Sequence, residues 1–183
     1  MVDPKLFIST PFEYTLVKSD VVMLEHPSWF YCMCPYPGHM SGCPMYGRPE
    51  CPPNTKTLFE LVDADQEIKL VGVYFDLGEY ALAKAREPLH RDDTFKQLRN
   101  SRHWQSSVDA KLKRSALELT GRWQDVVFIK RPEAHGVDVY GTCARLGVDI
   151  ERNVLQNCKK EARVTKVVMV GHDIEKRRNR LEW

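Results

Sequence analysis

The residues of this sequence best suited to chemistry are its six cysteines, because a thiolate is both a nucleophile and a strong metal ligand. They are Cys32, Cys34, Cys43, Cys51, Cys143 and Cys158. The N-terminus lacks the basic region and apolar stretch of a secretory signal, so we expect a cytoplasmic protein whose thiols stay reduced. In that compartment the four clustered cysteines are better read as metal ligands or redox groups than as disulfides.

The spacing of the first four cysteines is Cys32-x-Cys34-x8-Cys43-x7-Cys51. Four thiolates can hold a structural zinc ion or an iron–sulfur cluster. The paired Cys-x2-Cys knuckles of a zinc ribbon are absent, and three of the four cysteines precede a proline, a pattern that recurs beside iron–sulfur clusters. We therefore predict that these four cysteines bind a metal centre. A [4Fe–4S] cluster is favoured over zinc.

Three alternatives stay open at these cysteines. In an extended chain the one-residue spacing would place Cys32 and Cys34 on opposite sides, so the two need not both be ligands. On that reasoning Cys34, Cys43 and Cys51 are the preferred set. His39 lies between them and could replace one cysteine as a ligand. The four residues could also be free thiols, or form disulfides after oxidation.

Residues 31–53 form a distinct stretch that holds the four cysteines and six of the 11 prolines of the chain. Prolines at this density exclude a helix through the stretch and a central strand. A loop of this length is uncommon in a compact domain unless something orders it. The free energy of metal binding would offset the chain entropy that is lost when the loop becomes ordered. We predict a Cys/Pro-rich metal-binding loop over residues 31–53.

The rest of the chain alternates strand and helix patterns. Strands are predicted at 16–17 or 21–24, 68–75, 126–129 and 164–170, and helices at 58–62, 79–85, 104–119, 137–146 and 154–162, with a loop over 88–103. Apolar residues recur on one helical face through 104–119, which makes that helix the clearest. The pattern predicts one layered domain over residues 1–183, of α/β or α+β class, with a mixed sheet flanked by helices.

Composition excludes several classes of protein. Hydrophobic residues are 43% and charged residues 28%, as in a soluble globular chain. No run approaches about 18 apolar residues, so we expect no membrane insertion. Residues 1–80 carry 5 basic and 11 acidic side chains, whereas the C-terminal part is basic. This uneven and weak net charge does not favour a nucleic-acid partner. The basic run over 176–180 is best read as a solvated terminal segment.

Two short motifs resemble those of an uncharacterised family of predicted metal-binding proteins. The first is Cys43-Pro-Met-Tyr-Gly47 followed by Cys51-Pro-Pro53. The second is Arg131-Pro132 followed by Gly136-Val-Asp-Val-Tyr140 and Thr142. Members of that family commonly carry a further cysteine group before the Arg-Pro motif, but residues 104–130 contain none here. The resemblance therefore implies a single-site protein. It also implies partners among complexes of anaerobic metabolism, because the family is frequent in anaerobic archaea and bacteria.

Other candidate chemistry is weak. The glycine-rich loops that bind nucleotides and the motifs of serine hydrolases and zinc proteases are absent. We assign no catalytic residue and no further cofactor-binding residue. Cys143 and Cys158 fall on predicted helices and are best read as small buried apolar residues. His103 and His172, the latter followed by Asp173, are read as caps or packing residues. His90 is read as part of a solvated polar loop, and His135, in the second motif, as a weak site candidate.

Two functions of different class remain. The first is an accessory protein whose metal-bound loop docks on a larger protein complex and responds to redox state or oxygen. The second is a small iron–sulfur electron-transfer protein or enzyme. The lack of a second catalytic constellation favours the first. The sequence does not name a small-molecule substrate. The loop is rich in apolar bulk that could cover a cluster or contact a partner, namely Trp29–Tyr31, Met33, Met40, Met45 and Tyr46.

Overall fold

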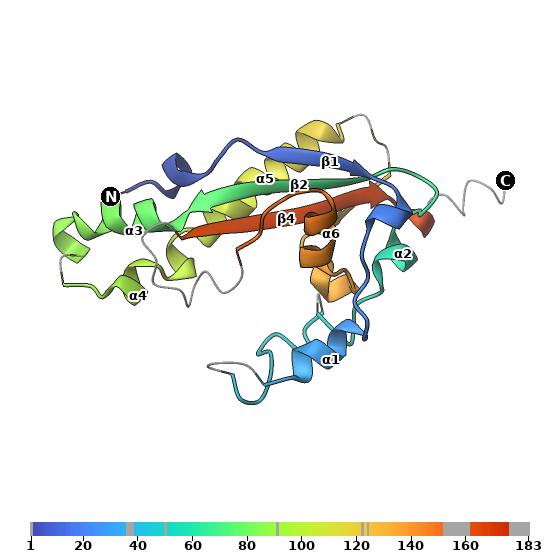
Figure 1. Cartoon of the computed structure of the whole chain (residues 1–183), viewed down its shortest axis with the longest axis horizontal. Coiled ribbons are helices and arrows are strands. Elements are labelled where there is room, and N and C mark those ends of the chain that lie inside the picture. The colour runs from blue at the N-terminus through green and yellow to red at the C-terminus, as the bar shows by residue number, and fades with distance from the viewer. Residues whose placement is uncertain are drawn as a thin grey trace. The chain divides into compact units, whose positions relative to one another are not determined.

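The computed structural model of the chain describes residues 2–35, 39–49, 51–90, 92–121, 123, 125–151 and 162–175 (Figure 1). Three sequence predictions lie outside these residues. They are the helix over 154–162 apart from Ala162, the interior position of Cys158, and the solvated basic run over 176–180.

Four antiparallel strands form the sheet, in the order β1-β2-β4-β3 (Figure 1). They are β1 (Phe12–Leu16), β2 (Ile68–Asp76), β3 (Val126–Ile129) and β4 (Arg163–His172). In the β3–β4 pair Val126 lies opposite His172 and Ile129 lies opposite Met169. The strands β2, β3 and β4 confirm predicted strands, and the antiparallel pairing selects α+β from the two classes that the sequence left open. The stretch 21–24 is not a strand; only Met23 forms a bridge, with Val137.

Six α-helices are present in the described part of the chain. They are α1 (Ser28–Met33), α2 (Leu58–Leu61), α3 (Leu77–Ala85), α4 (Phe95–Leu98), α5 (Gln105–Leu119) and α6 (Val139–Arg145). Helices α2, α3, α5 and α6 match predicted helices. The stretch 88–103, which was predicted to include a loop, contains α4 and two 3-10 turns, η3 (Pro88–His90) and η4 (Ser101–His103). These elements are too short to show a helical period in the sequence.

Helix starts follow from capping side chains. The Asp76 carboxylate accepts a hydrogen bond from the backbone N–H of Glu79 at the start of α3. Asp138 does the same for Gly141 at the start of α6. Thr57 and Glu60 form a capping box at the start of α2. Such caps satisfy backbone donors that have no partner in the first helical turn.

Helix α1 corrects one expectation about the cysteine-rich loop, which was predicted to contain no helix. The helix runs from Ser28 to Met33 and so covers the first residues of that stretch. Proline is absent from residues 28–34 and returns at Pro35, so nothing in these residues breaks a short helix. We call residues 28–53, which include α1 and the loop, the cysteine segment.

The chain divides into two compact units, and three of the five boundaries fall within β1, β2 and β4. Unit 1 comprises Met1–Glu13, Val71–Gly121 and Asp149–Val167; unit 2 comprises Tyr14–Leu70, Arg122–Val148 and Val168–Trp183. The single domain over residues 1–183 stays a prediction. All four clustered cysteines belong to unit 2.

Unit 1 is ordered by a core between strand and helix. The ring of Phe75 on β2 stacks on Trp104 at a centroid distance of 4.7 Å. The apolar face of α5 predicted from the sequence is buried at Val108 and Leu112, whereas Leu119 at the end of the helix is 39% exposed. Burying a side chain of this size stabilises the folded state by about 1.5–3 kcal/mol.

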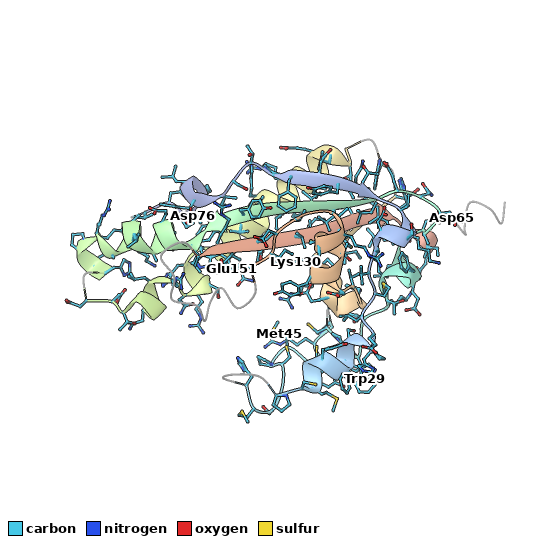
Figure 2. All side chains as sticks on the ribbon, in the orientation of Figure 1. Trp29, Met45, Asp65, Asp76, Lys130 and Glu151 are labelled. Atoms are coloured by element: carbon cyan, nitrogen blue, oxygen red, sulfur yellow. The ribbon has the colours of Figure 1, made fainter. Side chains whose placement is uncertain are left out.

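Unit 2 fixes both ends of the cysteine segment on one short turn, η5 (Pro132–His135). The hydroxyl of Ser28, at the start of the segment, donates a hydrogen bond to the carbonyl oxygen of Ala134 at 3.0 Å. The hydroxyl of Thr55, just after the segment, donates to the same oxygen at 3.0 Å. The side chains of Trp29 and Met45 mark the segment in Figure 2. The turn that carries the second sequence motif therefore anchors the segment that carries the first.

Candidate metal centre

A close backbone approach places Cys43 beside Cys32. The N–H of Cys43 donates a hydrogen bond to the carbonyl oxygen of Cys32 at 2.7 Å. The preceding residue, Gly42, has a φ of +87°, and a Cβ atom there would lie 2.6 Å from the same oxygen. Only glycine fits this position without a shift of the backbone. Gly42 therefore allows the loop to return against α1.

A second turn returns the chain from Cys43 to Cys51. The N–H of Tyr46 donates to the carbonyl of Cys43 at 3.1 Å, and the N–H of Gly47 donates to the carbonyl of Pro52 at 2.8 Å. The side-chain amide of Asn54 donates to the carbonyl of Gly47 at 2.9 Å. The Cys-Pro-x-Tyr-Gly motif is thus a hydrogen-bonded turn, and Cys51 lies where this turn closes.

The thiols of Cys43 and Cys51 lie within electrostatic reach of the Cys32 thiol, and we call these three thiols the thiol group. A side-chain hydrogen bond joins Cys32 and Cys43. Burial raises the pKa of the Cys32 thiol, and the nearby Cys43 and Cys51 raise it further because like charges oppose ionisation. The more distant carboxylate of Glu133 acts in the same direction. All described cysteines are free thiols.

Arg131 contributes a positive charge to this group. Its Nη1 atom donates a hydrogen bond to Cys51 Sγ at 3.4 Å, and Cys51 is 5% exposed. The guanidinium places a hydrogen-bond donor and a positive charge beside a candidate thiolate ligand. The sequence placed Arg131 only in the second motif and did not predict its contact with Cys51. The sequence signal that pointed toward this contact was the presence of both motifs in one chain.

Cys34 makes a hydrogen bond within its own helix. Its Sγ donates to the carbonyl of Phe30, one helical turn back, at 3.4 Å. The sequence argument preferred Cys34 to Cys32 because it assumed an extended chain around both. Cys32 lies within α1 and Cys34 at its C-cap, so that assumption does not hold, and the ligand role of each stays a prediction. The His39 backbone carbonyl accepts the Gly42 N–H at 3.0 Å and so helps to form the first turn.

The side chains as they stand do not form a ready coordination shell. Across the described residues, no set of three or more His, Cys, Asp or Glu side chains is arranged so that it could hold a metal ion. The donor chemistry of Cys32, Cys43 and Cys51 is that of a thiolate-bound centre. Each thiolate of a four-iron cluster binds a different iron, so cluster ligands lie farther apart than the ligands of a single ion.

Apolar side chains around these cysteines are exposed to solvent. Trp29 is 43% exposed, Met33 is 55% exposed and Met40 is 80% exposed. Phe30, Tyr31 and Tyr46 are exposed as well. We call these six residues the apolar rim. Single exposed apolar residues are ordinary, but a contiguous set marks a contact surface.

The other candidate residues named from the sequence, one cysteine and several histidines, are buried or contact neighbouring residues. Cys143 on α6 is fully buried, as predicted, and burial raises its pKa to about 11, with a further contribution from Asp138. The ring of His172 stacks on Trp123 at 4.1 Å. His135 Nδ1 lies 2.7 Å from the carbonyl oxygen of Lys56, just after the cysteine segment. In unit 1 His90 Nδ1 lies 2.6 Å from the Asp93 carboxylate.

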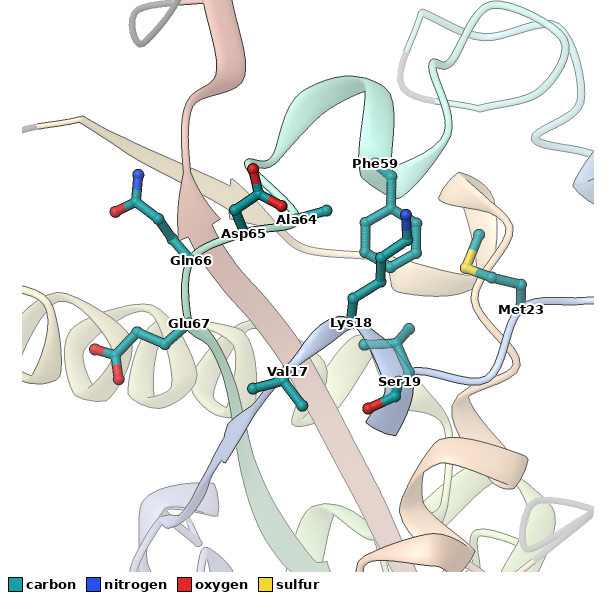
Figure 3. A pocket seen from close by; sticks show the side chains of 10 residues that line it. Val17, Lys18, Ser19, Met23, Phe59, Ala64, Asp65, Gln66 and Glu67 are labelled. Atoms are coloured by element: carbon teal, nitrogen blue, oxygen red, sulfur yellow. The ribbon is translucent and has the colours of Figure 1, made fainter.

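Unit 2 also contains a surface pocket of about 720 Å³ that is separate from the cysteines (Figure 3). Its lining residues are Val17, Lys18, Ser19, Val21, Met23, Phe59 and Ala64–Glu67. Figure 3 shows Lys18 across the ring of Phe59, and its ammonium lies 5.4 Å from the ring centroid. The pocket is open and mostly apolar, and none of the four clustered cysteines lines it.

Comparisons of the chain with protein-family models, with curated proteins and with solved structures found no match. The resemblance of the two motifs to a metal-binding family therefore stays a prediction. Among the described residues, no helix combines the length and the apolar content needed to cross a bilayer.

Proposed function

We propose that this protein binds an iron–sulfur cluster through its cysteine segment and serves as a redox- or oxygen-responsive accessory protein that docks on a larger partner complex. One observation carries the proposal: Cys32, Cys43 and Cys51 are grouped, and Arg131 donates a hydrogen bond to Cys51. Thiolates are the ligands of such clusters, and hydrogen bonds to ligand sulfurs tune cluster potentials.

The sequence around the thiols supports a cluster over zinc. Cys43 and Cys51 each precede a proline, a pattern that recurs beside iron–sulfur clusters, and the paired Cys-x2-Cys knuckles of a zinc ribbon are absent. Zinc remains the competing centre in the experiment below.

Access from solvent supports a response to oxygen or redox state. Cys32 and Cys43 are half-buried, so an oxidant can reach a centre that they hold. The apolar rim borders the same cysteines and offers a partner a contact surface. Loss of the centre would remove the ligand that orders this surface. Binding of the partner would then depend on the state of the centre.

The first experiment measures metal and acid-labile sulfide in anaerobically purified protein. About four irons and four sulfides per chain are expected, with a visible absorption that air removes. Cys43→Ala and Cys51→Ala lose both iron and sulfide. Cys143→Ala, a cysteine variant outside the group, retains both. One zinc without sulfide would make the centre structural, and no metal in the wild-type protein would refute the proposal.

A second experiment tests docking on a partner. Trp29→Ala and Met33→Ala remove parts of the apolar rim, so complexes isolated anaerobically from native cells are expected to lose the protein. Leu117→Ala is the matched control, because Leu117 on α5 is 54% exposed and belongs to unit 1. Equal association of all three variants would contradict docking through the cysteine segment.

The alternative function is electron transfer or catalysis by the same centre. The half-buried positions of Cys32 and Cys43 favour it, because a centre near the surface exchanges electrons over short distances. A reversible one-electron couple that is retained through repeated cycles would support electron transfer. Loss of the centre upon oxidation would support the accessory role.

A further inference from the structure

The open pocket of unit 2 is lined by three short segments that local hydrogen bonds hold in place (Figure 3). The first is the 3-10 turn η2 (Lys18–Asp20), in which the carboxylate of the last residue accepts the Val17 N–H at 2.9 Å. The second is the capped helix α2, which carries Phe59. The third is the turn over residues 63–66, where the Asp63 carboxylate accepts a backbone N–H at 3.1 Å and a side-chain amide at 2.8 Å. Walls fixed in this way favour ligand binding, because little chain entropy is lost.

The interior of this pocket suits an apolar group. Its volume of about 720 Å³ lies in the range of small-molecule sites, about 300–1,000 Å³. Val21 is buried, whereas Val17 and Met23 are exposed to solvent along the pocket. The ring of Phe59 is half-buried. A ligand with an apolar body would remove this apolar surface from water, which is favourable.

Lys18 gives the pocket a positive charge that an aromatic ring holds. Its ammonium lies 5.4 Å from the centroid of the Phe59 ring, and within the described part of the chain it forms no ion pair. A ring face attracts a cation but offers its N–H donors no lone pair. A carboxylate on a bound ligand would supply acceptors for these donors, and a hydrogen bond between charged groups is stronger than one between neutral groups.

Two carboxylates also line the pocket, those of Asp65 and Glu67. Glu67 Oε2 lies 3.5 Å from the Lys69 ammonium, which offsets its charge. Both acidic residues are exposed, so water and salt screen their repulsion of a ligand with one negative charge. A ligand with several negative charges would be repelled more strongly. The charges of the pocket therefore favour a single carboxylate.

We propose that this pocket binds a small apolar carboxylate, whose apolar body covers Phe59 and Met23 and whose carboxylate pairs with the ammonium of Lys18. None of the four clustered cysteines lines the pocket, so the inference does not rest on the proposed metal centre. It gives unit 2 a second binding activity. Failure of this inference would leave the proposed function unaffected.

Titration with three ligands that share one apolar body tests the charge preference. 4-Phenylbutyrate carries a carboxylate, 4-phenylbutanamide is neutral, and 4-phenylbutylamine carries a positive charge. Binding is followed by nuclear magnetic resonance, through the backbone amide signals of residues 17–19 and 64–67. The carboxylate is expected to bind about fivefold more tightly than the amide, because it gains an exposed ion pair. Tighter binding of the amine, or unchanged signals at about 10 mM 4-phenylbutyrate, would overturn the inference.

Two variants test where the ligand lies. Lys18→Gln is expected to bind the carboxylate and the amide equally, and to keep the wild-type affinity for the amide. Lys5→Gln is the matched control, because Lys5 is an exposed lysine of unit 1, and it should keep the fivefold preference. Phe59→Ala is expected to weaken binding of both ligands alike, since both share the apolar contact. A preference that persists in Lys18→Gln, or unchanged affinities in Phe59→Ala, would overturn the assignment of this pocket.

Discussion

Phe30 and Phe75 are the same residue type in two regions that are built in opposite ways. Phe75 on β2 is fully buried and stacks on Trp104 in unit 1. Phe30, on α1 in the cysteine segment, is 43% exposed, and its ring lies near that of His26. Burial orders the first region. Glycine turns, backbone hydrogen bonds and a group of thiols order the second, so its apolar side chains are left for other uses.

The largest expected difference between the regions concerns these two aromatic rings. Phe75→Ala should lower the free energy of unfolding by about 3–5 kcal/mol, because it leaves a cavity in a packed core. Phe30→Ala should cost less than about 1 kcal/mol, since its ring is already in contact with water. Urea denaturation of both variants measures the contrast. Equal costs would show that the cysteine segment also depends on apolar burial.

A pair of glycines tests what orders the cysteine segment. Gly42→Ala places a Cβ atom 2.6 Å from a backbone oxygen at positive φ, whereas nothing lies within 4 Å of a Cβ at Gly47. Both variants incur the cost of a left-handed backbone, about 1–2 kcal/mol, and Gly42→Ala adds the clash. We expect Gly42→Ala to lose metal and Gly47→Ala to retain most of it. Equal metal contents in the two variants would show that metal binding does not depend on the close approach of Cys32 and Cys43.

The buried thiol of Cys143 gives a prediction about pH. Burial raises its folded-state pKa from 9.0 to about 11. Below pH 9 the thiol is neutral in both states, so its contribution to stability is fully present. As pH rises from 9 to 11 the thiol ionises in the unfolded chain first, which removes about 2–3 kcal/mol of stability. The wild-type protein should therefore lose more stability over this range than Cys143→Ala, as measured by urea denaturation at each pH. Parallel losses would show that Cys143 has no such role.

The smallest expected effect is at the start of α2, which follows shortly after the cysteine segment. The Thr57 hydroxyl and backbone N–H both donate to the Glu60 carboxylate at the start of α2. Thr57→Ala should cost about 1 kcal/mol through loss of this cap, and Thr57→Ser should restore most of it. Thermal unfolding detects the difference. A decrease in metal content in Thr57→Ala would show that the cap also supports the segment.

Prediction from the sequence succeeded for elements whose hydrophobic pattern extends over many residues. The alternation and apolar run of 68–75 and the helical face of 104–119 identify β2 and α5, because burial of one face requires those patterns. The short elements within 88–103 carry too few residues to show a period. The grouping of the cysteines was harder. The ranking of Cys34 over Cys32 depended on an extended chain, whereas Cys32 lies in a helix of six residues and Cys34 is its C-cap.

The contact between Arg131 and Cys51 could not be derived from local sequence. The two residues are 80 positions apart, and their approach depends on how the chain returns between them. Motif spacing reports the chemistry of neighbours along the chain, whereas this contact depends on tertiary structure. The resemblance indicated that both motifs matter. The structure shows where they meet, at the turn η5.

The carbonyl oxygen of Ala134 accepts hydrogen bonds from both Ser28 and Thr55, so the cysteine segment leaves and rejoins unit 2 at one atom. Its ends are therefore already as close as those of a tight loop. For such a loop the entropy of closure grows only with the logarithm of its length, by about 0.6 kcal/mol per doubling. The segment can consequently gain or lose residues between these anchors at small cost to the rest of the fold. We therefore expect the sheet to form whatever the length of the chain between these two anchors.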